Sequence, residues 1–438
     1  MSTRAIPLPR RMPPVSPADG PASAPPHRNL RWQMTAFLAT AAAFNFADRA
    51  VMSSVLSAVR VDLALSDVAL GLLGSVFLWS YALGSPFAGL LADRFSRSRI
   101  VVISLVAWSA VTALTGLAES FPVLLGLRVG LGIAECLFFP AAFALIAQHH
   151  GPVTRGRAMS LMSVGINCGM VLGGSLAGLL AQHYGWRSGF LVFGLAGIAL
   201  ALCSRSFLPS APPAPAADAA PRPTFLAALK HLSGVPTYYA MVAESMLSGM
   251  GMWIFFTWLP LYLRETYGMS LAAAGFAGTF MLQISVMLGL TFGGWVSDRA
   301  AARSPHRRVL VYGSCYLLAA PFLLLFLGTP AFAVVAAGIT AFSFFRGVGQ
   351  ANDHPTLCEI VPPNLRSTAI GLMNACATAS GGCGVFLAGY LKREVGLGAV
   401  FAGIAGAFLL AGAIMLFSYH RFARRDFERA GAAEPVAG

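Results

Sequence analysis

Long apolar segments alternate with short polar ones along most of the chain. A bilayer core of about 30 Å is crossed by about 20 apolar residues in a helix, so such segments predict membrane spans. The first set comprises residues 32–55, 69–91, 99–117, 122–146, 158–181 and 188–206. The second set comprises residues 236–262, 271–296, 309–327, 331–353, 367–390 and 397–418. The pattern predicts an all-α polytopic membrane protein with twelve transmembrane helices.

The segments that interrupt this pattern predict how the helices are grouped. Residues 207–235 contain a Pro/Ala-rich run that cannot cross a membrane, which predicts a flexible linker. The first residues are rich in Pro, Ala and Ser and predict a disordered tail. We therefore expect a cytoplasmic N-terminal tail, a six-helix bundle, a cytoplasmic linker, a second six-helix bundle and a cytoplasmic C-terminal tail, at residues 1–31, 32–206, 207–235, 236–419 and 420–438.

A repeated order of Ser, Gly, Asp and Arg indicates that the two bundles are related. Ser66 corresponds to Ser270, 204 positions later, and Asp93 corresponds to Asp298, 205 positions later. The stretch beginning at residue 152 corresponds to the one beginning at residue 363, 211 positions later. Convergent hydrophobicity alone would not repeat these residues in order. The nearly constant offset predicts a duplicated six-helix unit, and transporters built in this way hold their substrate between the halves near mid-membrane.

Composition and charge agree with a membrane protein. Hydrophobic residues are 57% of the 438 residues and charged residues are 11%, whereas soluble proteins carry about 25% charged residues. The formal net charge is +13, and the predicted spans place most Lys and Arg on the side of both termini. Because cytoplasmic loops are enriched in Lys and Arg, we expect both termini in the cytoplasm and a plasma (inner) membrane location. The positive charge therefore does not indicate nucleic-acid binding.

The sequence carries no motif for a cofactor, a metal or a nucleotide. Its seven cysteines lie in apolar stretches without CxxC spacing, its eight histidines lack metal-binding spacing, and it has no Walker loop. We therefore expect no cofactor and no metal. A proton gradient is the expected energy source, with sodium as the open alternative.

Ionisable residues inside the predicted spans are the candidate site, because each costs roughly 2.5–3.5 kcal/mol on insertion scales. The first helix carries Asn45 close to Asp48 and Arg49. The fourth helix carries Arg128 and Glu135, which are seven residues apart and share a face. The tenth helix carries Arg346, which the offset of 211 aligns with Glu135. The repeat thus predicts that Glu135 and Arg346 face each other across a cavity.

Two interpretations of these charges stay open. They can be structural ion pairs, although buried pairs are often replaceable by apolar residues without loss of stability. They can also bind substrate and protons, in which case Arg49 is free to bind a substrate carboxylate through its planar fork. We expect the substrate to be bound by Arg49, with Asn45 and Arg346, and protons to be carried by Asp48 and Glu135.

Three further polar residues in the second half have two interpretations each. Asp353 and His354, at the end of the tenth helix, either form a proton relay or are solvated or gate-forming residues. Glu244, in the seventh helix, either faces the cavity or makes a contact between helices.

The loop GLLADRFSRSR at Gly89–Arg99 resembles the signature loop between the second and third helices of the major facilitator superfamily, and Gly294–Arg303 is its weaker second copy. Ser96 stands where a glycine is common. The resemblance extends from Trp32 to about Tyr419. The loop's aspartate can pair with a basic residue or a helix N-terminus, which would hold the halves in one conformation; alternatively, the arginines only set topology. The expected gating residues are Gly89, Asp93, Arg94, Arg97, Asp298 and Arg299.

The Asp-Arg pair of the first helix, with the Arg and Glu of the fourth, resembles the anion:cation symporter branch of this superfamily. Members of that branch take up sugar acids and other organic anions with protons. The resemblance implies that Arg49 and Arg128 contact substrate and that Asp48 and Glu135 carry protons. The Spinster-like branch, which exports lysolipids or amphipathic compounds, shares these charges and is the alternative.

The expected function is therefore proton-coupled symport of a small organic anion by alternating access. The sequence shows no nucleophile–base pair or metal cluster that would support an enzyme, whereas a sensor that reuses the same fold stays a second alternative. The expected partners are an anionic small-molecule substrate and the lipid bilayer, with no nucleic acid. We expect a monomer.

Overall fold

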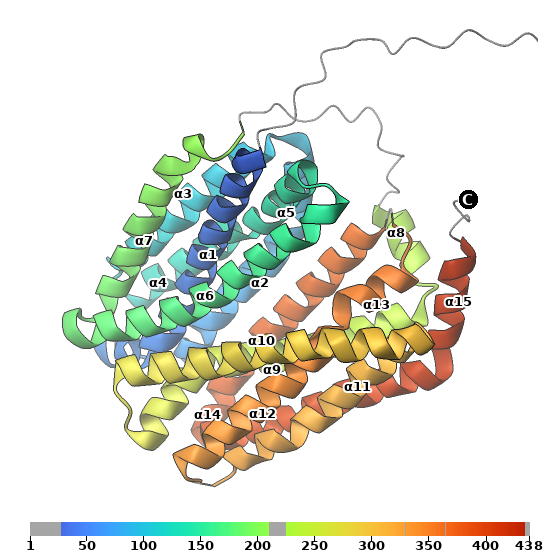
Figure 1. The fold of residues 1–438 in the computed structure, drawn as a ribbon. Helices are drawn as coiled ribbons and strands as arrows, with labels where there is room; N and C mark the ends of the chain where they lie inside the picture. The colour runs from blue at the N-terminus through green and yellow to red at the C-terminus, as the bar shows by residue number, and fades with distance from the viewer. Residues whose placement is uncertain (1–27, 210–224, 329, 364, 434–438) are drawn as a thin grey trace, which may run out of the picture.

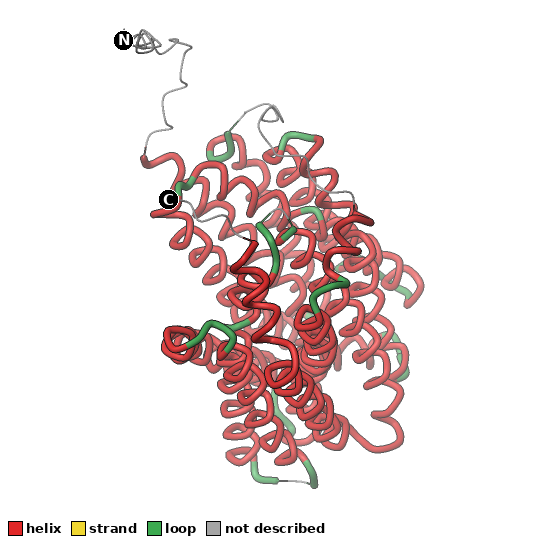
Figure 2. The backbone as a smooth tube through the Cα atoms, turned by 90° about the vertical axis from the view of Figure 1, so that its right-hand side faces the viewer, coloured by secondary structure: helices red, strands yellow, loops and turns green. Residues whose placement is uncertain are grey.

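The computed structural model describes residues 28–209, 225–328, 330–363 and 365–433. Over these residues every regular element is helical, and short loops join the helices (Figure 2). In chain order the elements are α1 (Arg28–Asp62), α2 (Asp67–Arg94), α3 (Arg97–Thr115), α4 (Phe121–Cys136), α5 (Phe138–His149), α6 (Pro152–Tyr184), α7 (Trp186–Cys203), η1 (Ser204–Ser206), α8 (Phe225–Leu232), α9 (Pro236–Tyr267), α10 (Leu271–Arg303), α11 (Arg307–Ala319), η2 (Ala320–Phe326), α12 (Phe332–Gln350), α13 (Asp353–Ile360), α14 (Arg366–Ser418), η3 (Tyr419–Ala423) and α15 (Arg424–Ala433).

The helices account for the twelve predicted spans. Ten stretches among the described residues are long and apolar enough to cross a membrane. One of them, Arg366–Ala430, contains the predicted spans 367–390 and 397–418. The backbone turns between these two spans at Gly396, whose φ of 76° and ψ of 162° favour glycine. The ten do not include α1, whose centre carries Asn45, Asp48 and Arg49.

The predicted repeat is visible in matching local structure. Ser66 and Ser270 are both N-caps, and each side chain accepts a hydrogen bond of 3.2 Å from the backbone N–H three residues later. Gly185 and Gly396, which are 211 positions apart, both have a positive φ, 81° and 76°. Equivalent helices of the two halves therefore begin and turn in the same way.

The two groups of helices meet at one end of the molecule. In Figure 1, α1–α7 (blue to green) and α9–α14 (yellow to red) approach at the lower left and separate towards the upper right. At the meeting end α6 packs on α10, where a Cβ at Gly178 would lie 2.4 Å from the carbonyl oxygen of Leu271. Likewise α2 packs on α14, where a Cβ at Gly389 would lie 2.6 Å from the carbonyl oxygen of Asp67. Only glycine permits these close approaches.

The apolar stretches Phe121–His149 and Phe332–Ile360 are each divided into two α-helices. Pro140 has no backbone N–H to donate to the carbonyl of Cys136, and α4 ends at Cys136. In the second half Pro355 lies in the first turn of α13, and its missing N–H leaves the carbonyl of Ala351, just after the end of α12 at Gln350, without a helical donor. Both divisions lie beside ionisable residues, since Glu135 is in the last turn of α4 and Asp353 begins α13.

Short helices occupy segments for which the sequence predicts a linker and a tail. α8 lies within residues 207–235, and α15 lies within residues 420–438. Asp426 of α15 is buried against the beginning of α9, so this part of the predicted C-terminal tail is packed. Of the predicted N-terminal tail, residues 1–27 lie outside the described part of the structure, and α1 begins at Arg28.

Candidate functional site

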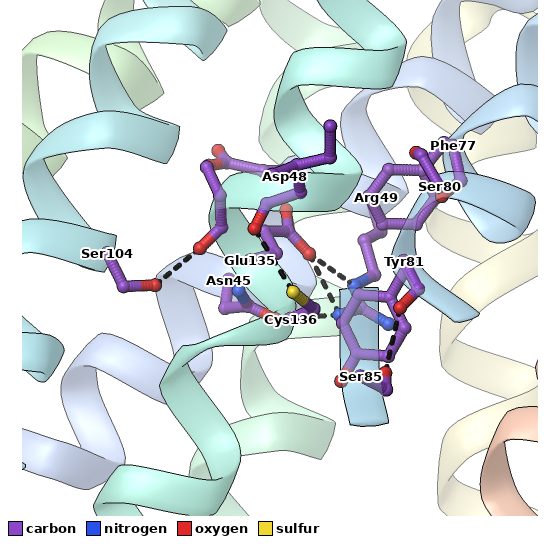
Figure 3. Close-up of polar contacts among 12 residues, drawn as sticks. Asn45, Asp48, Arg49, Phe77, Ser80, Tyr81, Ser85, Ser104, Glu135 and Cys136 are labelled. Carbon is purple, nitrogen blue, oxygen red and sulfur yellow. Dashed lines mark hydrogen bonds and ion pairs between the residues drawn. The ribbon is translucent and has the colours of Figure 1, made fainter. Parts of the chain in front are cut away.

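The predicted charges of the first and fourth helices come together inside the first group of helices. α1 supplies Asn45, Asp48 and Arg49, and α4 supplies Arg128 and Glu135. All five side chains are buried. Figure 3 shows Arg49 and Asn45 directed towards Glu135, with Asp48 on the other side of the same group.

Arg49 is held by a dense set of contacts. Its Nε and Nη2 both lie 2.8 Å from Oε2 of Glu135, and Nη2 also donates to Oδ1 of Asn45 at 3.1 Å. Its guanidinium also lies over the rings of Phe46 and Tyr81, 4.5 and 4.8 Å from their centroids. Contrary to our expectation, Arg49 is therefore not free, because a buried guanidinium requires a counter-charge and Glu135 provides it.

Asp48 and Arg128 have unused hydrogen-bonding capacity. Oδ2 of Asp48 accepts a bond of 3.0 Å from the hydroxyl of Thr112 on α3, a residue that the sequence analysis did not identify. Within the described part of the chain, Oδ1 of Asp48, Nε and Nη2 of Arg128 and Oε1 of Glu135 have no hydrogen-bond partner. If these charges formed structural ion pairs, the sequence would allow Asp48 with Arg49 and Arg128 with Glu135; the described ion pair in this cluster is instead Arg49 with Glu135.

The break between α4 and α5 helps to place Glu135. Because Pro140 ends the α4 hydrogen-bond ladder, carbonyls of the last turn need other partners. The hydroxyl of Ser104 on α3 donates to the carbonyl of Ala134 at 2.6 Å (Figure 3). This contact fixes the last turn of α4 against α3, next to Glu135.

Arg346 does not pair with Glu135. It is buried on α12, and its Nη1 donates to Gln350 at 3.1 Å. Its charged neighbours are Glu244 and Asp353 of the same half. The repeat aligns Arg346 with Glu135 along the chain, and each residue has its polar partners in its own bundle. That the two residues face each other across a cavity stays a prediction.

The predicted gating residues have different outcomes. The side chains of Asp93 and Arg94, and the surroundings of Gly89, lie outside the described part of the structure. Arg97 donates a hydrogen bond of 3.1 Å to Gln148. The guanidinium carbon of Arg299 lies 3.5 Å from the centroid of the Trp295 ring.

The second copy of the signature loop has an ion pair that matches the expected chemistry. Asp298 lies 3.0 Å from Arg308, which also contacts Glu359 at 3.1 Å. Arg308 therefore ties the end of α10 to α13.

The meeting end of the two halves carries an ionic network that the sequence analysis missed. Arg60 lies 2.7 Å from Glu265 and 3.4 Å from Asp67. Lys392 lies 2.8 Å from Asp67 and 2.9 Å from Glu265. We call these four residues the distal network. Because Arg60 and Asp67 come from one half and Glu265 and Lys392 from the other, the network joins the halves at this end.

Known proteins similar to this chain include transporters and an efflux pump. The hexuronate transporter of Bacillus subtilis (strain 168) is 26% identical over 398 residues, covering 87% of this chain and 91% of that protein. A probable galactarate/D-glucarate transporter of the same organism is 29% identical over 301 residues, covering 62% of this chain and 65% of that protein. An MFS-type efflux pump of Mycolicibacterium smegmatis (strain ATCC 700084 / mc(2)155) is 28% identical over 417 residues, covering 90% of this chain and 94% of that protein.

The fold is shared with solved transporters. A bacterial homologue of the human lysosomal transporter Spinster, in an inward-facing and unoccupied conformation, aligns with a TM-score of 0.73 and 22% identity over 92% of this chain and 98% of that chain. The model of the Major Facilitator Superfamily matches residues 38–352, which include the signature loop at Gly89–Arg99 and its second copy at Gly294–Arg303. This chain therefore belongs to the Major Facilitator Superfamily and is a multi-pass membrane transporter rather than an enzyme.

Proposed function

We propose that this protein is a proton-coupled symporter of a small organic anion, such as a sugar acid or another carboxylate, and works by alternating access. In this proposal Asn45, Arg49, Arg128 and Arg346 bind the substrate, and Asp48 and Glu135 carry protons. The distal network and the ion pair between Asp298 and Arg308 act at opposite ends of the halves as gates.

The observation that carries the proposal is the charge balance of the buried cluster on α1 and α4. Two arginines, Arg49 and Arg128, face two carboxylates, Asp48 and Glu135, so the ionised group is neutral. Entry of a carboxylate substrate would add a negative charge in a medium where unbalanced charge is costly. Binding a proton to Glu135 or Asp48 restores neutrality, and protonation of Glu135 also releases Arg49 towards the substrate. Substrate and proton therefore favour each other's binding.

The unpartnered nitrogens of Arg128 support the same proposal. A buried arginine normally uses its N–H groups, since leaving them without acceptors is costly. Nε and Nη2 of Arg128 are two donors on one side of a planar fork, which suits the two oxygens of a carboxylate. The named hexuronate and galactarate/D-glucarate transporters act on substrates of this chemical class.

Export of an amphipathic compound is the alternative. The similar efflux pump of Mycolicibacterium smegmatis supports that direction of transport. The two proposals differ in the substrate, since a lysolipid needs a long apolar surface and a sugar acid needs hydroxyl and carboxylate partners. The buried arginine–carboxylate cluster favours the sugar acid.

The positive charge distribution supports an orientation with both termini in the cytoplasm of a plasma (inner) membrane. In that orientation the distal network lies outside, and the halves diverge towards the cytoplasm. We further propose that each six-helix half is one bundle, residues 32–206 and 236–419, and that the protein acts as a monomer.

Uptake by proteoliposomes tests the proposal. The protein is reconstituted and given D-glucuronate, D-glucarate or a lysolipid, under an inward proton gradient or an inward sodium gradient. We expect a sugar acid to accumulate with the proton gradient and a protonophore to abolish accumulation. Sodium-driven uptake would contradict proton coupling, and lysolipid movement alone would favour the exporter. If no compound moved and none raised the melting temperature, a sensor would be the better interpretation.

A further inference from the structure

We propose that Glu244, Tyr312 and Asp353 form a second proton-binding site, located in the second half of the protein and separate from Asp48 and Glu135. The inference rests on the proposed proton-coupled function and adds a site to it. Its ligand is a proton, and its consequence is that one more proton accompanies each transported anion than the first half alone would carry.

Glu244 is the centre of this site. It is a carboxylate on α9 that is 1% exposed. Its Oε2 accepts hydrogen bonds from the hydroxyl of Tyr312 on α11 and, at 3.4 Å, from the hydroxyl of Ser245. Its Oε1 has no hydrogen-bond partner among the described residues. A fully buried carboxylate with a bare oxygen is costly when ionised, and binding a proton removes that charge.

Asp353 and Arg346 set the charge of the site. Asp353, at the start of α13, also faces the hydroxyl of Tyr312, and its Oδ1 has no partner in the described structure. Arg346 on α12 is the neighbouring cation, and its Nε likewise has no partner there. One guanidinium therefore faces two carboxylates, and the group carries one excess negative charge unless it binds one proton. Tyr316, on α11, is neutral and does not change this balance.

The chemistry favours a proton over a metal cation. Several elements around Glu244 present hydrogen-bond donors: α9 presents Ser245, α11 presents Tyr312 and Tyr316, and α12 presents Arg346, whereas α13 presents the carboxylate of Asp353. A sodium ion needs a shell of acceptor oxygens, and it would be repelled by the guanidinium. A single tyrosine hydroxyl between two carboxylates suits one shared proton.

The arrangement also provides a path for that proton. Asp353 is only partly buried, whereas Tyr312 and Glu244 are almost fully buried. A protonated Asp353 can donate to the oxygen of Tyr312 while the Tyr312 hydroxyl gives its own proton to Glu244. One O–H bond forms and one breaks at the tyrosine, and the proton is transferred without a charged intermediate on it. His354, the other predicted relay residue, is exposed and is not required.

The test measures how strongly a proton gradient accumulates the anion. Wild type, Glu244→Gln and Asp353→Asn are reconstituted at zero membrane potential with a pH gradient of one unit and a monoanionic sugar acid. Each coupled proton contributes about tenfold to accumulation per pH unit. We expect either variant to accumulate about tenfold less than wild type, while exchange of substrate at equal pH persists.

Two further variants separate the relay from simple loss of structure. Tyr312→Phe removes the hydroxyl between the carboxylates, and we expect it to slow proton-driven uptake more than exchange. Tyr262→Phe is the matched control. Tyr262, on α9, is buried like Tyr312, but its hydroxyl has no partner in the described structure. We expect Tyr262→Phe to match wild type, and Glu244→Asp to restore accumulation lost in Glu244→Gln.

The outcomes distinguish this inference from the proposed function. If wild type itself does not accumulate an anion with a pH gradient, the proposed symport is wrong. If wild type does so and Glu244→Gln, Asp353→Asn and Tyr312→Phe keep the same accumulation and rate, the second site is wrong. The second proton site is also wrong if Glu244→Gln changes how uptake depends on sodium and leaves its dependence on the pH gradient unchanged. If Glu244→Gln does not exchange substrate, accumulation and exchange are compared in Tyr312→Phe and Glu244→Asp instead. Wild-type uptake rate and accumulation in Tyr312→Phe would then rule out the second site.

Discussion

Glu135 is the residue whose replacement should separate exchange from accumulation. Glu135→Gln keeps the shape of the side chain and mimics the protonated acid, so the anion can still enter beside Arg49. We expect exchange of substrate at equal pH to persist and accumulation driven by a pH gradient to be lost. Both are measured in proteoliposomes with a labelled sugar acid.

The matched control for this prediction is Glu119→Gln. Glu119 is a carboxylate of the same half, but it is exposed in the connection between α3 and α4. Its replacement should leave accumulation unchanged. Retained accumulation in Glu135→Gln would contradict a coupling role for Glu135.

Arg49 should not be replaceable by lysine. Its Nε and Nη2 reach Glu135 while Nη2 also reaches Asn45, and a lysine ammonium cannot reproduce this planar geometry. Hydrogen bonds to charged groups contribute about 1.5–3 kcal/mol each, so we expect Arg49→Lys to weaken substrate binding about tenfold or more. The measurement is the KM of uptake, with the exposed Arg393→Lys as control; an unchanged KM would place the substrate carboxylate elsewhere.

For single residues, the sequence predicts which charged side chains are buried but not which residues they pair with. Ionisable residues in apolar spans are conspicuous, and Asp48, Arg49, Arg128 and Glu135 are all buried. Adjacent residues on a helix point in different directions, so Asp48 reaches Thr112 on α3 while Arg49 reaches Glu135 on α4. The direction of each side chain depends on helix packing, which periodicity does not specify.

Among the elements, α15 provides a test of packing at the end of the chain. Asp426 is buried, and its Oδ2 accepts bonds of 2.9 Å from the backbone N–H and 2.7 Å from the hydroxyl of Thr237 in the first turn of α9. A carboxylate at a helix N-terminus is favourable because it accepts free N–H groups and complements the helix dipole.

Asp426→Asn should therefore destabilise the protein by about 1–3 kcal/mol, the cost of leaving a buried donor poorly satisfied. The expected result is a lower melting temperature of the purified protein in detergent. Glu428→Gln on the same helix is the control, because Glu428 is exposed and pairs only with Arg424 among the described contacts. Equal melting temperatures of the Asp426 variant and wild type would mean that α15 does not stabilise α9.

The contrast between α15 and the spans explains what could be predicted for elements. Twenty apolar residues in succession have few alternatives to a membrane helix, so the twelve spans follow from the sequence. α15 has ten residues and many charges, and its contact depends on the buried Asp426 meeting α9 across 189 positions of sequence. Its short amphipathic pattern does not distinguish a packed helix from a solvated tail.

For the whole molecule, the repeat predicts two halves but not the contacts that hold them together. Lys392 and Asp67 are 325 positions apart in the sequence, and the repeat has Leu271, not an acid, at the position that corresponds to Asp67. Their pairing arises because α2 and α14 approach through glycines at the meeting end. The conformation of the transporter therefore depends on contacts that appear only when the halves are assembled.

The distal network should set the balance between the two conformations of the transport cycle. The side chain of Lys392 is 8% exposed and lies between Asp67 and Glu265, so Lys392→Gln leaves two carboxylates with less compensation. Partly exposed pairs contribute about 0.2–1 kcal/mol each, and loss of two should raise the population opened at this end about two- to thirtyfold.

Spin labels at Val61 on α1 and Val395 on α14 measure this opening, because both positions are exposed and lie on different halves beside the network. We expect a longer distance population in Lys392→Gln than in the unmodified background. Arg393→Gln is the matched control, since the neighbouring Arg393 is 84% exposed and contacts neither Asp67 nor Glu265 among the described ion pairs. Adding substrate should change the distances between the labels in all three proteins. Before substrate is added, only Lys392→Gln should differ from the unmodified background. Identical distributions in all three proteins would show that apolar and glycine packing between α2 and α14, rather than charge, holds this end closed.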